Sequence, residues 1–137
     1  MTKKILCPTD GTDHSTHAVI QAAEMAVRSK AALTLCTVNI AHGGGRGPII
    51  NHWTDAQVEK ILDDAAALAG QHGIQEPHKA AILSREAAAG IVSYAETHGF
   101  DHIVMGTGDK RGISRLVLGS VAADVAGRAH CTVTVAR

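Results

Sequence analysis

Apolar residues along this chain form short continuous runs that alternate with stretches of helical periodicity. The continuous runs predict five strands, over residues 4–8, 32–40, 78–83, 103–105 and 131–136. Apolar positions spaced three and four residues apart predict four helices, over residues 14–29, 54 to about 70, 84 to about 98, and 118 to about 130. Strands of this kind between amphipathic helices are typical of a parallel sheet covered on both faces. We therefore predict an α/β fold, doubly wound around a five-stranded parallel sheet.

Polar residues and glycines mark the ends of these elements. Thr54 and Gln57 have the spacing of a capping box at the start of the second helix. Ser84 is the expected N-cap of the third helix, and Gly99 is expected to end it. The segment HGGGRGP, residues 42–48, is predicted to be a mobile loop because of its composition.

The stretch from Asp101 to Val121 carries the strongest chemical signal. Its apolar strand is followed by Gly106, Gly108, Gly112 and Gly119 before the last helix begins. A backbone without side chains can approach an anion closely, and the positive end of the helix dipole adds attraction. The stretch is therefore a candidate phosphate-binding loop, and ordinary turn formation by glycine is the alternative.

Two motifs in this chain resemble the universal stress protein family. The family's nucleotide loop has a glycine, two residues, a glycine, nine residues, and then glycine followed by serine or threonine. Gly106 and the pair Gly119–Ser120 match both ends, whereas Asp109 occupies the second glycine position. The opening segment KKILCPTDGTDHSTHAV is similar to the family's first strand, terminal aspartate and first helix. The resemblance covers essentially the whole chain.

The resemblance implies a strand order of 3-2-1-4-5 and a ligand site at the carboxyl ends of strands 1 and 4, where the order reverses. It implies ATP as the ligand and Mg²⁺ as a candidate cofactor. The residue matching Asp10 helps hold the adenine end in the family, and the residue matching Val38 contributes backbone contacts to the base. The nucleotide-binding residues implied in this way are Pro8, Thr9, Asp10, Val38, Met105, Gly106, Thr107, Gly108, Asp109, Arg115, Gly119, Ser120 and Val121.

Simpler roles stay open for several of these residues. Asp10 could end its strand and hydrogen-bond only its own turn, and Ser120 could act only as a helix cap. His14 and His17 are a weak candidate pair of metal ligands, because no third ligand follows at a suitable spacing. No sequence motif of a hydrolase or of a Walker-type nucleotidase is present, so no catalytic residue is predicted and the activity expected is at most a slow ATPase.

Composition narrows the class of protein further. The 137 residues are 45% hydrophobic, which suits one domain with one core. Thirteen basic residues balance thirteen acidic residues, and aromatic residues make up 2%, so nucleic-acid binding is disfavoured. No apolar run approaches the roughly 18 residues of a membrane span or resembles a signal peptide, so a soluble, cytoplasmic protein is expected. Cys7, Cys36 and Cys131 lack CxxC spacing and are expected to be buried, reduced thiols.

Two functional hypotheses follow. The first is an ATP-binding regulatory module of the stress response, and the second is a family member that binds no nucleotide and acts through protein partners. Both include a C2 homodimer, because residues 132–135, TVTV, form an uncharged strand at the edge of the sheet. The family resemblance implies pairing through this strand.

Asp109 generates the first testable prediction. A carboxylate about 5 Å from one phosphate charge costs roughly 0.8 kcal/mol at the dielectric constant of water and about 3 kcal/mol at an effective value of about 20. About 4 kcal/mol separates micromolar from millimolar affinity, so this repulsion would weaken ATP binding unless Mg²⁺ or the nearby Lys110, Arg111 and Arg115 offset it. We expect Asp109→Gly to bind ATP more tightly than wild type when Mg²⁺ is left out, as measured by calorimetry. Equal affinities without Mg²⁺ would refute the repulsion, and no binding by either protein would favour the second hypothesis.

Overall fold

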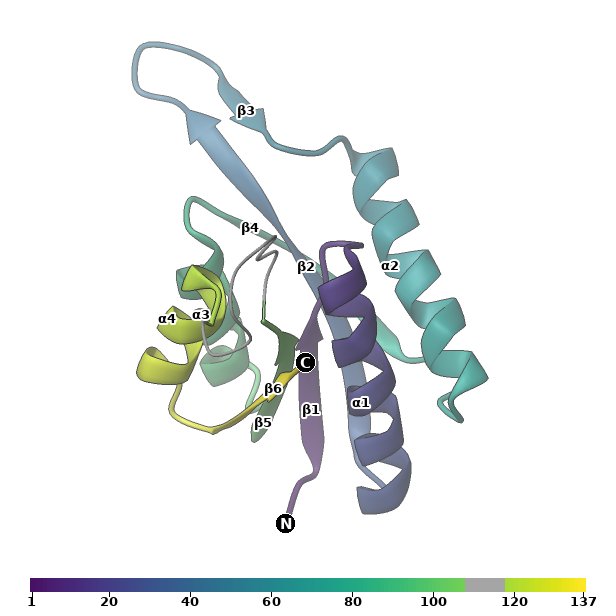
Figure 1. The fold of residues 1–137 in the computed structure, drawn as a ribbon. Helices are drawn as coiled ribbons and strands as arrows, with labels where there is room; N and C mark the ends of the chain where they lie inside the picture. Colours follow the sequence, from purple (N-terminus) through teal and green to yellow (C-terminus); the bar gives the residue numbers. More distant parts are fainter. Residues whose placement is uncertain (108–117) are drawn as a thin grey trace.

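Strands and helices alternate through residues 1–107 and 118–137, the part of the chain that the computed structural model describes (Figure 1). The strands are β1 (Lys4–Pro8), β2 (Ala32–Gly43), β3 (Ile49–Asn51), β4 (His78–Ser84), β5 (His102–Gly106) and β6 (Thr132–Ala136). The helices are α1 (Asp13–Ser29), α2 (Asp55–Gln71), α3 (Ala87–Thr97) and α4 (Ser120–Arg128). No helix in this part of the chain is long and apolar enough to cross a membrane.

The parallel core of the sheet confirms the predicted fold class and strand order. β1 lies between β2 and β5, with β4 beyond β2 and β6 beyond β5. The five predicted strands therefore follow the order 3-2-1-4-5. Because β1 is flanked by strands on both sides and covered on both faces, its residues Ile5, Leu6 and Cys7 are fully buried.

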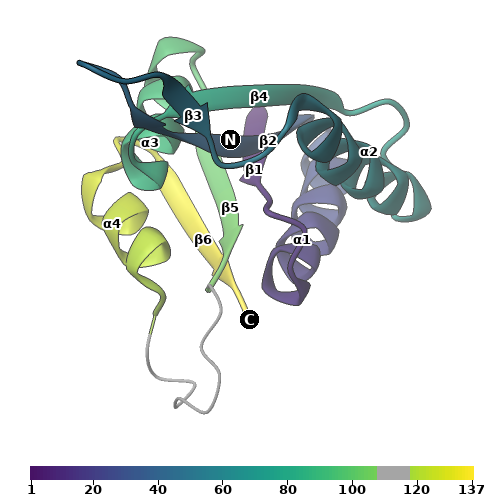
Figure 2. The same ribbon diagram turned by 90° about the horizontal axis from the view of Figure 1, so that it is seen from above.

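The sheet differs from the prediction at the end of β2, which continues to Gly43 where Ile40 was expected to be the last residue. The chain then turns and returns as β3, which pairs with β2 in an antiparallel register of Ala41 with Asn51 and Gly43 with Ile49. His42 and Gly43 therefore belong to β2, whereas residues 44–48 form the loop of a β-hairpin, so the predicted loop is confirmed for these five residues and is shorter than expected. Glycines suit the turn, because Gly43, Gly44 and Gly45 all have positive φ angles. This hairpin arm extends away from the helices in both views (Figures 1 and 2).

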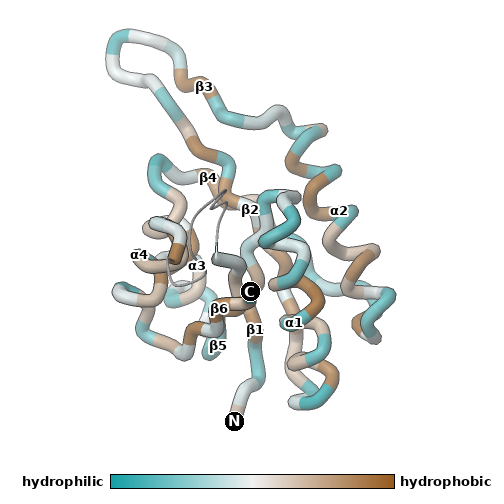
Figure 3. The backbone as a smooth tube through the Cα atoms, viewed as in Figure 1, coloured by the Kyte–Doolittle hydropathy of each residue, from teal (hydrophilic) through white to brown (hydrophobic). Residues whose placement is uncertain are grey.

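Two helices cover each face of the parallel sheet (Figure 2). On one face, buried side chains of α1 and α2, such as Val19 and Leu62, pack with Ile5 and Leu35 of the strands. On the opposite face, α3 and α4 pack against a second cluster that includes Leu6 and Ile103. Adjacent residues of β1 thus contribute to different clusters, as the alternation of side chains along a strand requires. Figure 3 shows the matching pattern of apolar and polar positions along α1 and α2.

The helix starts agree with the sequence in part. The predicted capping box of α2 is present, since the Thr54 side chain accepts from the Gln57 amide and the Gln57 side chain accepts from the Thr54 amide. α1 begins one residue earlier than predicted, after its N-cap Thr12. α4 begins at Ser120 with Gly119 as its N-cap, so Ser120 is not the cap, and it ends at Arg128 where His130 was expected.

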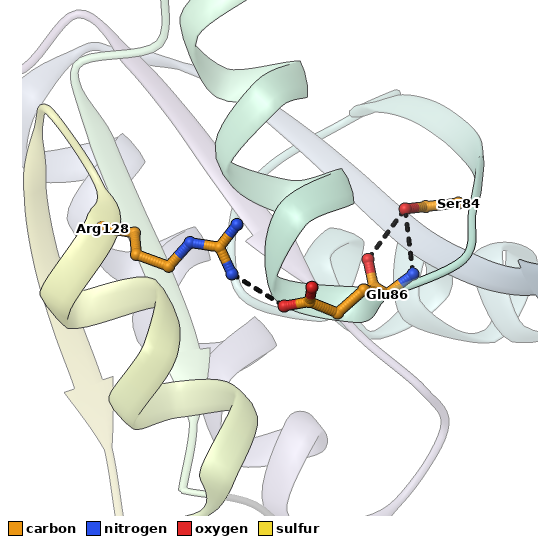
Figure 4. Close-up of polar contacts among 3 residues, drawn as sticks. All are labelled: Ser84, Glu86 and Arg128. Atoms are coloured by element: carbon orange, nitrogen blue, oxygen red, sulfur yellow. Dashed lines mark hydrogen bonds and ion pairs between the residues drawn. The ribbon is translucent and has the colours of Figure 1, made fainter.

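Ser84 is the last residue of β4, so the prediction that it caps α3 was wrong. Its hydroxyl accepts from the Glu86 amide at 3.3 Å and donates to the Glu86 carbonyl at 2.8 Å, which closes a local turn before the helix (Figure 4). Glu86 is the N-cap residue, and its carboxylate accepts from Arg128 of α4 at 2.7 Å. Because the Ser84 hydroxyl bonds to Glu86 within this turn, it does not accept a hydrogen bond from the first amides of α3.

The cysteines are free thiols, as predicted. Cys7 and Cys36 are fully buried on opposite faces of the sheet, in the two different clusters. Burial raises the pKa of the Cys7 thiol to about 12, and burial also raises the pKa of Cys36 well above its usual value. Cys131 is only partly buried and precedes β6, which begins at Thr132, so the predictions that it is buried and that the last strand begins at residue 131 were wrong.

The contact of β5 with α1 yields a stability prediction. A Cβ on Gly106 would overlap the carbonyl oxygen of His14 and lie 2.7 Å from its carbonyl carbon, and a rigid helix backbone cannot move aside. We expect Gly106→Ala to lower the free energy of unfolding by about 1–3 kcal/mol. The measurement is urea denaturation followed by circular dichroism.

The matched control is Gly127→Ala in α4, where a Cβ would meet nothing within 4 Å. Alanine is the better helix former there, so we expect Gly127→Ala to raise the unfolding free energy by about 0.5–1 kcal/mol. Equal effects of the two substitutions would show that the contact between β5 and α1 does not limit the packing.

Candidate functional site

The carboxyl ends of β1 and β5 lie side by side, and the helices that follow them lie on opposite faces of the sheet. α1 follows β1 on one face, and α4 is the next described helix after β5, on the other face. A crevice is expected at such a point, because neither helix covers the strand ends. The structure contains a cavity of about 430 Å³ there, which we call the crevice cavity.

The crevice cavity is lined by strand ends, two helix starts and the segment before α2. Its lining residues are Pro8, Thr9, Asp10, Thr12, His14, Ser15, Thr37, Val38, Ile40, His52, Trp53, Ala87, Ile91, Met105, Gly106, Gly119, Ser120, Val121 and Ala122. A second hollow, of about 370 Å³, lies between α1 and α2 and shares Thr9, Asp10 and Trp53 with the first.

Most of the residues predicted from the sequence meet in this cavity. Those that line it are Pro8, Thr9, Asp10, Val38, Met105, Gly106, Gly119, Ser120 and Val121. Thr107 does not line it, and its carbonyl instead accepts from the Gly119 amide at 2.6 Å. Gly108, Asp109 and Arg115 lie outside the described residues. Their roles toward a nucleotide stay predictions.

The turn after β1 is held by its own polar groups. The Thr9 hydroxyl donates to the Ser15 hydroxyl at 3.0 Å, and Ser15 donates to the Thr12 carbonyl at 2.9 Å. One carboxylate oxygen of Asp10 accepts from both the amide and the hydroxyl of Thr12, at 3.0 and 2.7 Å. Asp10 therefore makes the turn contacts that the simpler interpretation expected, and it also presents a fixed carboxylate at the cavity. These contacts are compatible with a ligand role, because they use only one of its two oxygens.

The start of α4 forms the opposite side of the cavity. Gly119 has extended backbone angles, φ −64° and ψ 155°, and no side chain caps the first turn of α4 within the described residues. The amides of a first helical turn have no partner within the helix, and they lie at the positive end of its dipole. Ser120 and Val121 line the cavity. This end of α4 is suited to an anionic group.

The wall formed by β2 contains residues that the sequence analysis missed. Val38 lies in the middle of β2, which extends five residues further. Its neighbours Thr37 and Asn39 are almost completely buried polar residues. Asn39 bonds to Trp53, which lines the cavity from the segment before α2. The available signals were polar residues within an apolar strand, and a single tryptophan just before a capping box.

The structure gives no further support to the histidine pair as metal ligands. His14 lines the cavity, and its Nδ1 lies 3.4 Å from the Thr107 hydroxyl. Across residues 1–107 and 118–137, no group of three or more His, Cys, Asp or Glu side chains is placed to hold a metal ion.

Comparison with known proteins shows which family this chain resembles. The model of the universal stress protein family matches residues 1–137. A universal stress protein of Methanocaldococcus jannaschii is 32% identical over 141 residues, covering 98% of this chain and 82% of the relative.

Solved structures share the fold. A universal stress protein in complex with cAMP has a TM-score of 0.78 at 23% identity, covering 99% of this chain and 97% of its own. The universal stress protein of Archaeoglobus fulgidus in complex with dAMP has a TM-score of 0.72 at 21% identity, covering 100% and 98%. The match of the family model over the whole chain, together with the archaeal relative, shows that this chain belongs to the universal stress protein family.

Proposed function

We propose that the crevice cavity binds an adenine nucleotide, in the first place ATP, and that the protein acts as a homodimeric regulatory module in the stress response. The observation that carries the proposal is the cavity itself. It lies where the strand order reverses, and it joins an apolar wall to the uncapped start of α4.

The chemistry of the lining suits a nucleotide. Pro8, Val38, Ile91 and Met105 provide apolar surface for a planar base. The first turn of α4 provides amides for a phosphate on the other side. A volume of about 430 Å³ is within the range of small-ligand sites, roughly 300–1,000 Å³. A ligand with an apolar planar end and an anionic end therefore fits a cavity that has an apolar wall on one side and helix amides on the other.

The solved relatives support the choice of adenine. Two structures with the same fold were solved in complex with cAMP and dAMP. Because they are 23% and 21% identical to this chain, they support the class of ligand, and the number of phosphates for this protein is part of the proposal.

Mg²⁺ is the proposed cofactor when ATP is bound. Asp10 is the one carboxylate among the described residues that line the cavity, and it is held in place by Thr12. Mg²⁺ is usually bound by one or two carboxylates together with waters and substrate phosphates, so a single carboxylate is sufficient on the protein side. The cation would neutralise phosphate charge.

The proposed homodimer uses β6. This strand pairs with β5 on one side and has no second strand partner in the described part of the chain. Thr132 at its start is exposed, and the strand carries no charged residue. An open, uncharged edge of this kind can pair with its copy around a two-fold axis.

Substitutions at Ser120 test the role of α4. Ser120 is the first residue of the helix, where proline is tolerated, and the extended Gly119 is compatible with a following proline. Ser120→Pro therefore removes one amide donor and the hydroxyl without breaking the helix, whereas Ser120→Ala removes only the hydroxyl. We expect Ser120→Pro to weaken AMP binding by about 1.5–3 kcal/mol, roughly 10- to 100-fold, and Ser120→Ala to weaken it less. Calorimetry with AMP measures both.

Adenosine is the control ligand, because it lacks the phosphate. Its affinity is expected to be the same in wild type, Ser120→Ala and Ser120→Pro. If Ser120→Pro binds AMP as tightly as wild type, the start of α4 does not hold the phosphate. If wild type binds no adenine nucleotide at all, the proposed function is wrong.

Charge at the sheet edges tests the homodimer. We expect wild type to sediment as a dimer at micromolar concentration and Thr132→Lys to shift toward monomer, because a lysine on an edge strand disfavours pairing of that edge with another strand. Leu83→Lys is the matched control, since Leu83 is 67% exposed on β4 at the opposite edge of the parallel sheet. A monomeric wild type, or equal behaviour of both variants, would contradict pairing through β6.

A further inference from the structure

Trp53 is the only tryptophan in the chain, and it lies in the wall of the crevice cavity. The chain has two other aromatic residues of the Phe and Tyr type, Tyr94 and Phe100, whose rings stack on each other with centroids 5.9 Å apart. Neither of them lines the cavity. The His52 ring, also in the lining, lies beside Trp53 with a centroid distance of 5.1 Å. The Trp53 and His52 rings therefore bring aromatic surface to the cavity from one short segment, and the His14 ring of α1 adds to it.

Asn39 of β2 holds this segment in place. Its side-chain oxygen accepts from the Trp53 amide at 2.8 Å, and its side-chain nitrogen donates to the Trp53 carbonyl at 3.0 Å. The His52 amide donates to the Ile40 carbonyl at 2.8 Å. Asn39 is 3% exposed, so water does not compete with these bonds. The position of the Trp53 backbone is consequently fixed from β2.

Thr37 adds an unpaired hydrogen-bonding group to the same wall. It precedes Asn39 by two residues on β2, so both side chains lie on one face of the sheet. Thr37 is 1% exposed and lines the cavity. Within the described residues, its hydroxyl is the one buried side-chain polar atom that has no hydrogen-bond partner. Buried hydroxyls are nearly always paired in folded proteins, by protein, water or ligand atoms, so the Thr37 hydroxyl in the cavity wall is a candidate partner for a polar atom of a ligand.

We propose that Trp53 and Thr37 form the base subsite of the cavity, in which the tryptophan ring contacts the planar face of the aromatic base and the Thr37 hydroxyl bonds to its polar edge. Asn39 is the positioning residue that sets the place of Trp53. This inference rests on the proposed nucleotide function and names the residues that select a ligand with an aromatic base. The first turn of α4, by contrast, contacts the phosphate.

The first experiment needs no substitution. Because Trp53 is the single tryptophan, the intrinsic fluorescence of wild type reports contact with its ring. We expect AMP to quench this fluorescence with the same dissociation constant that calorimetry gives. Ribose 5-phosphate, which has the sugar and phosphate but no base, is expected to leave the emission unchanged at concentrations that occupy the site.

Variants separate contact with the base from contact with the phosphate. We expect Trp53→Leu to weaken AMP binding about 5- to 100-fold, as loss of aromatic stacking on a base does, and Trp53→Phe to restore most of it. Thr37→Val is expected to weaken AMP binding about 3- to 10-fold while raising the melting temperature of the free protein, since it removes an unpaired buried hydroxyl. Neither change is expected to alter the affinity for ribose 5-phosphate. Tyr94→Leu, a change of an aromatic residue outside the cavity, is the matched control.

Asn39→Leu tests the positioning role. It removes both bonds to Trp53, so we expect AMP binding to weaken while binding of ribose 5-phosphate persists, which a merely unfolded protein could not show. If AMP leaves the fluorescence of wild type unchanged although calorimetry detects binding, or if Trp53→Leu binds AMP like wild type, the subsite is refuted and the proposed function stands. If AMP does not bind to wild type at all, both proposals fail.

Discussion

The candidate site depends on one constraint: the helices that follow the neighbouring strands β1 and β5 pack on opposite faces of the sheet. These strands are neighbours, yet α1 packs on one face of the sheet and α4 on the other. Each helix must cover apolar strand residues on its own face, so neither can cover the strand ends between them. The crevice cavity is therefore a consequence of packing two apolar layers.

Close contacts between backbone segments hold the rim of the cavity. Gly106 at the end of β5 lies against the His14 carbonyl of α1, at a distance that excludes a side chain. The Gly119 amide donates to the Thr107 carbonyl, which fixes the start of α4 relative to the end of β5. Three segments that are distant in sequence are thus joined without long side chains between them. Such a rim leaves amides accessible, as an anion site requires.

The β2–β3 hairpin contributes to the crevice cavity, although the tip of the hairpin lies away from the cavity. β2 continues past the parallel sheet, and β3 brings the chain back along it, so that His52 and Trp53 return beside Ile40 and Asn39. Arg85 donates to the Gly43 carbonyl at 2.8 Å and connects the arm to the end of β4. Ile49 and Ile50 on β3 stay more than half exposed, and Figure 3 shows an apolar stretch at β3. Because these side chains are not buried, the pairing of β3 with β2 rests on main-chain hydrogen bonds.

The sequence by itself determined the class of the fold and the order of the five parallel strands and four helices. Those features follow from local signals: continuous apolar runs for β1 and β5, helical periodicity for α1 and α2, and the capping box at Thr54. The family motifs led to Asp10, Gly106 and the Gly119–Ser120 pair, and these residues meet in the cavity.

Only the tertiary structure decided the β2–β3 hairpin, the cap of α3 and the wall that contains Trp53. The residues concerned, Ser84, Asn39 and Thr37, are polar groups whose partners depend on what surrounds them. A serine hydroxyl can cap a helix or close its own turn with similar local cost, and packing selects between the two. Asn39 pairs with Trp53, fourteen positions away, only because the hairpin returns the chain to it. Hydrophobic periodicity is a local property, whereas the pairing of buried polar groups is decided by the assembled fold.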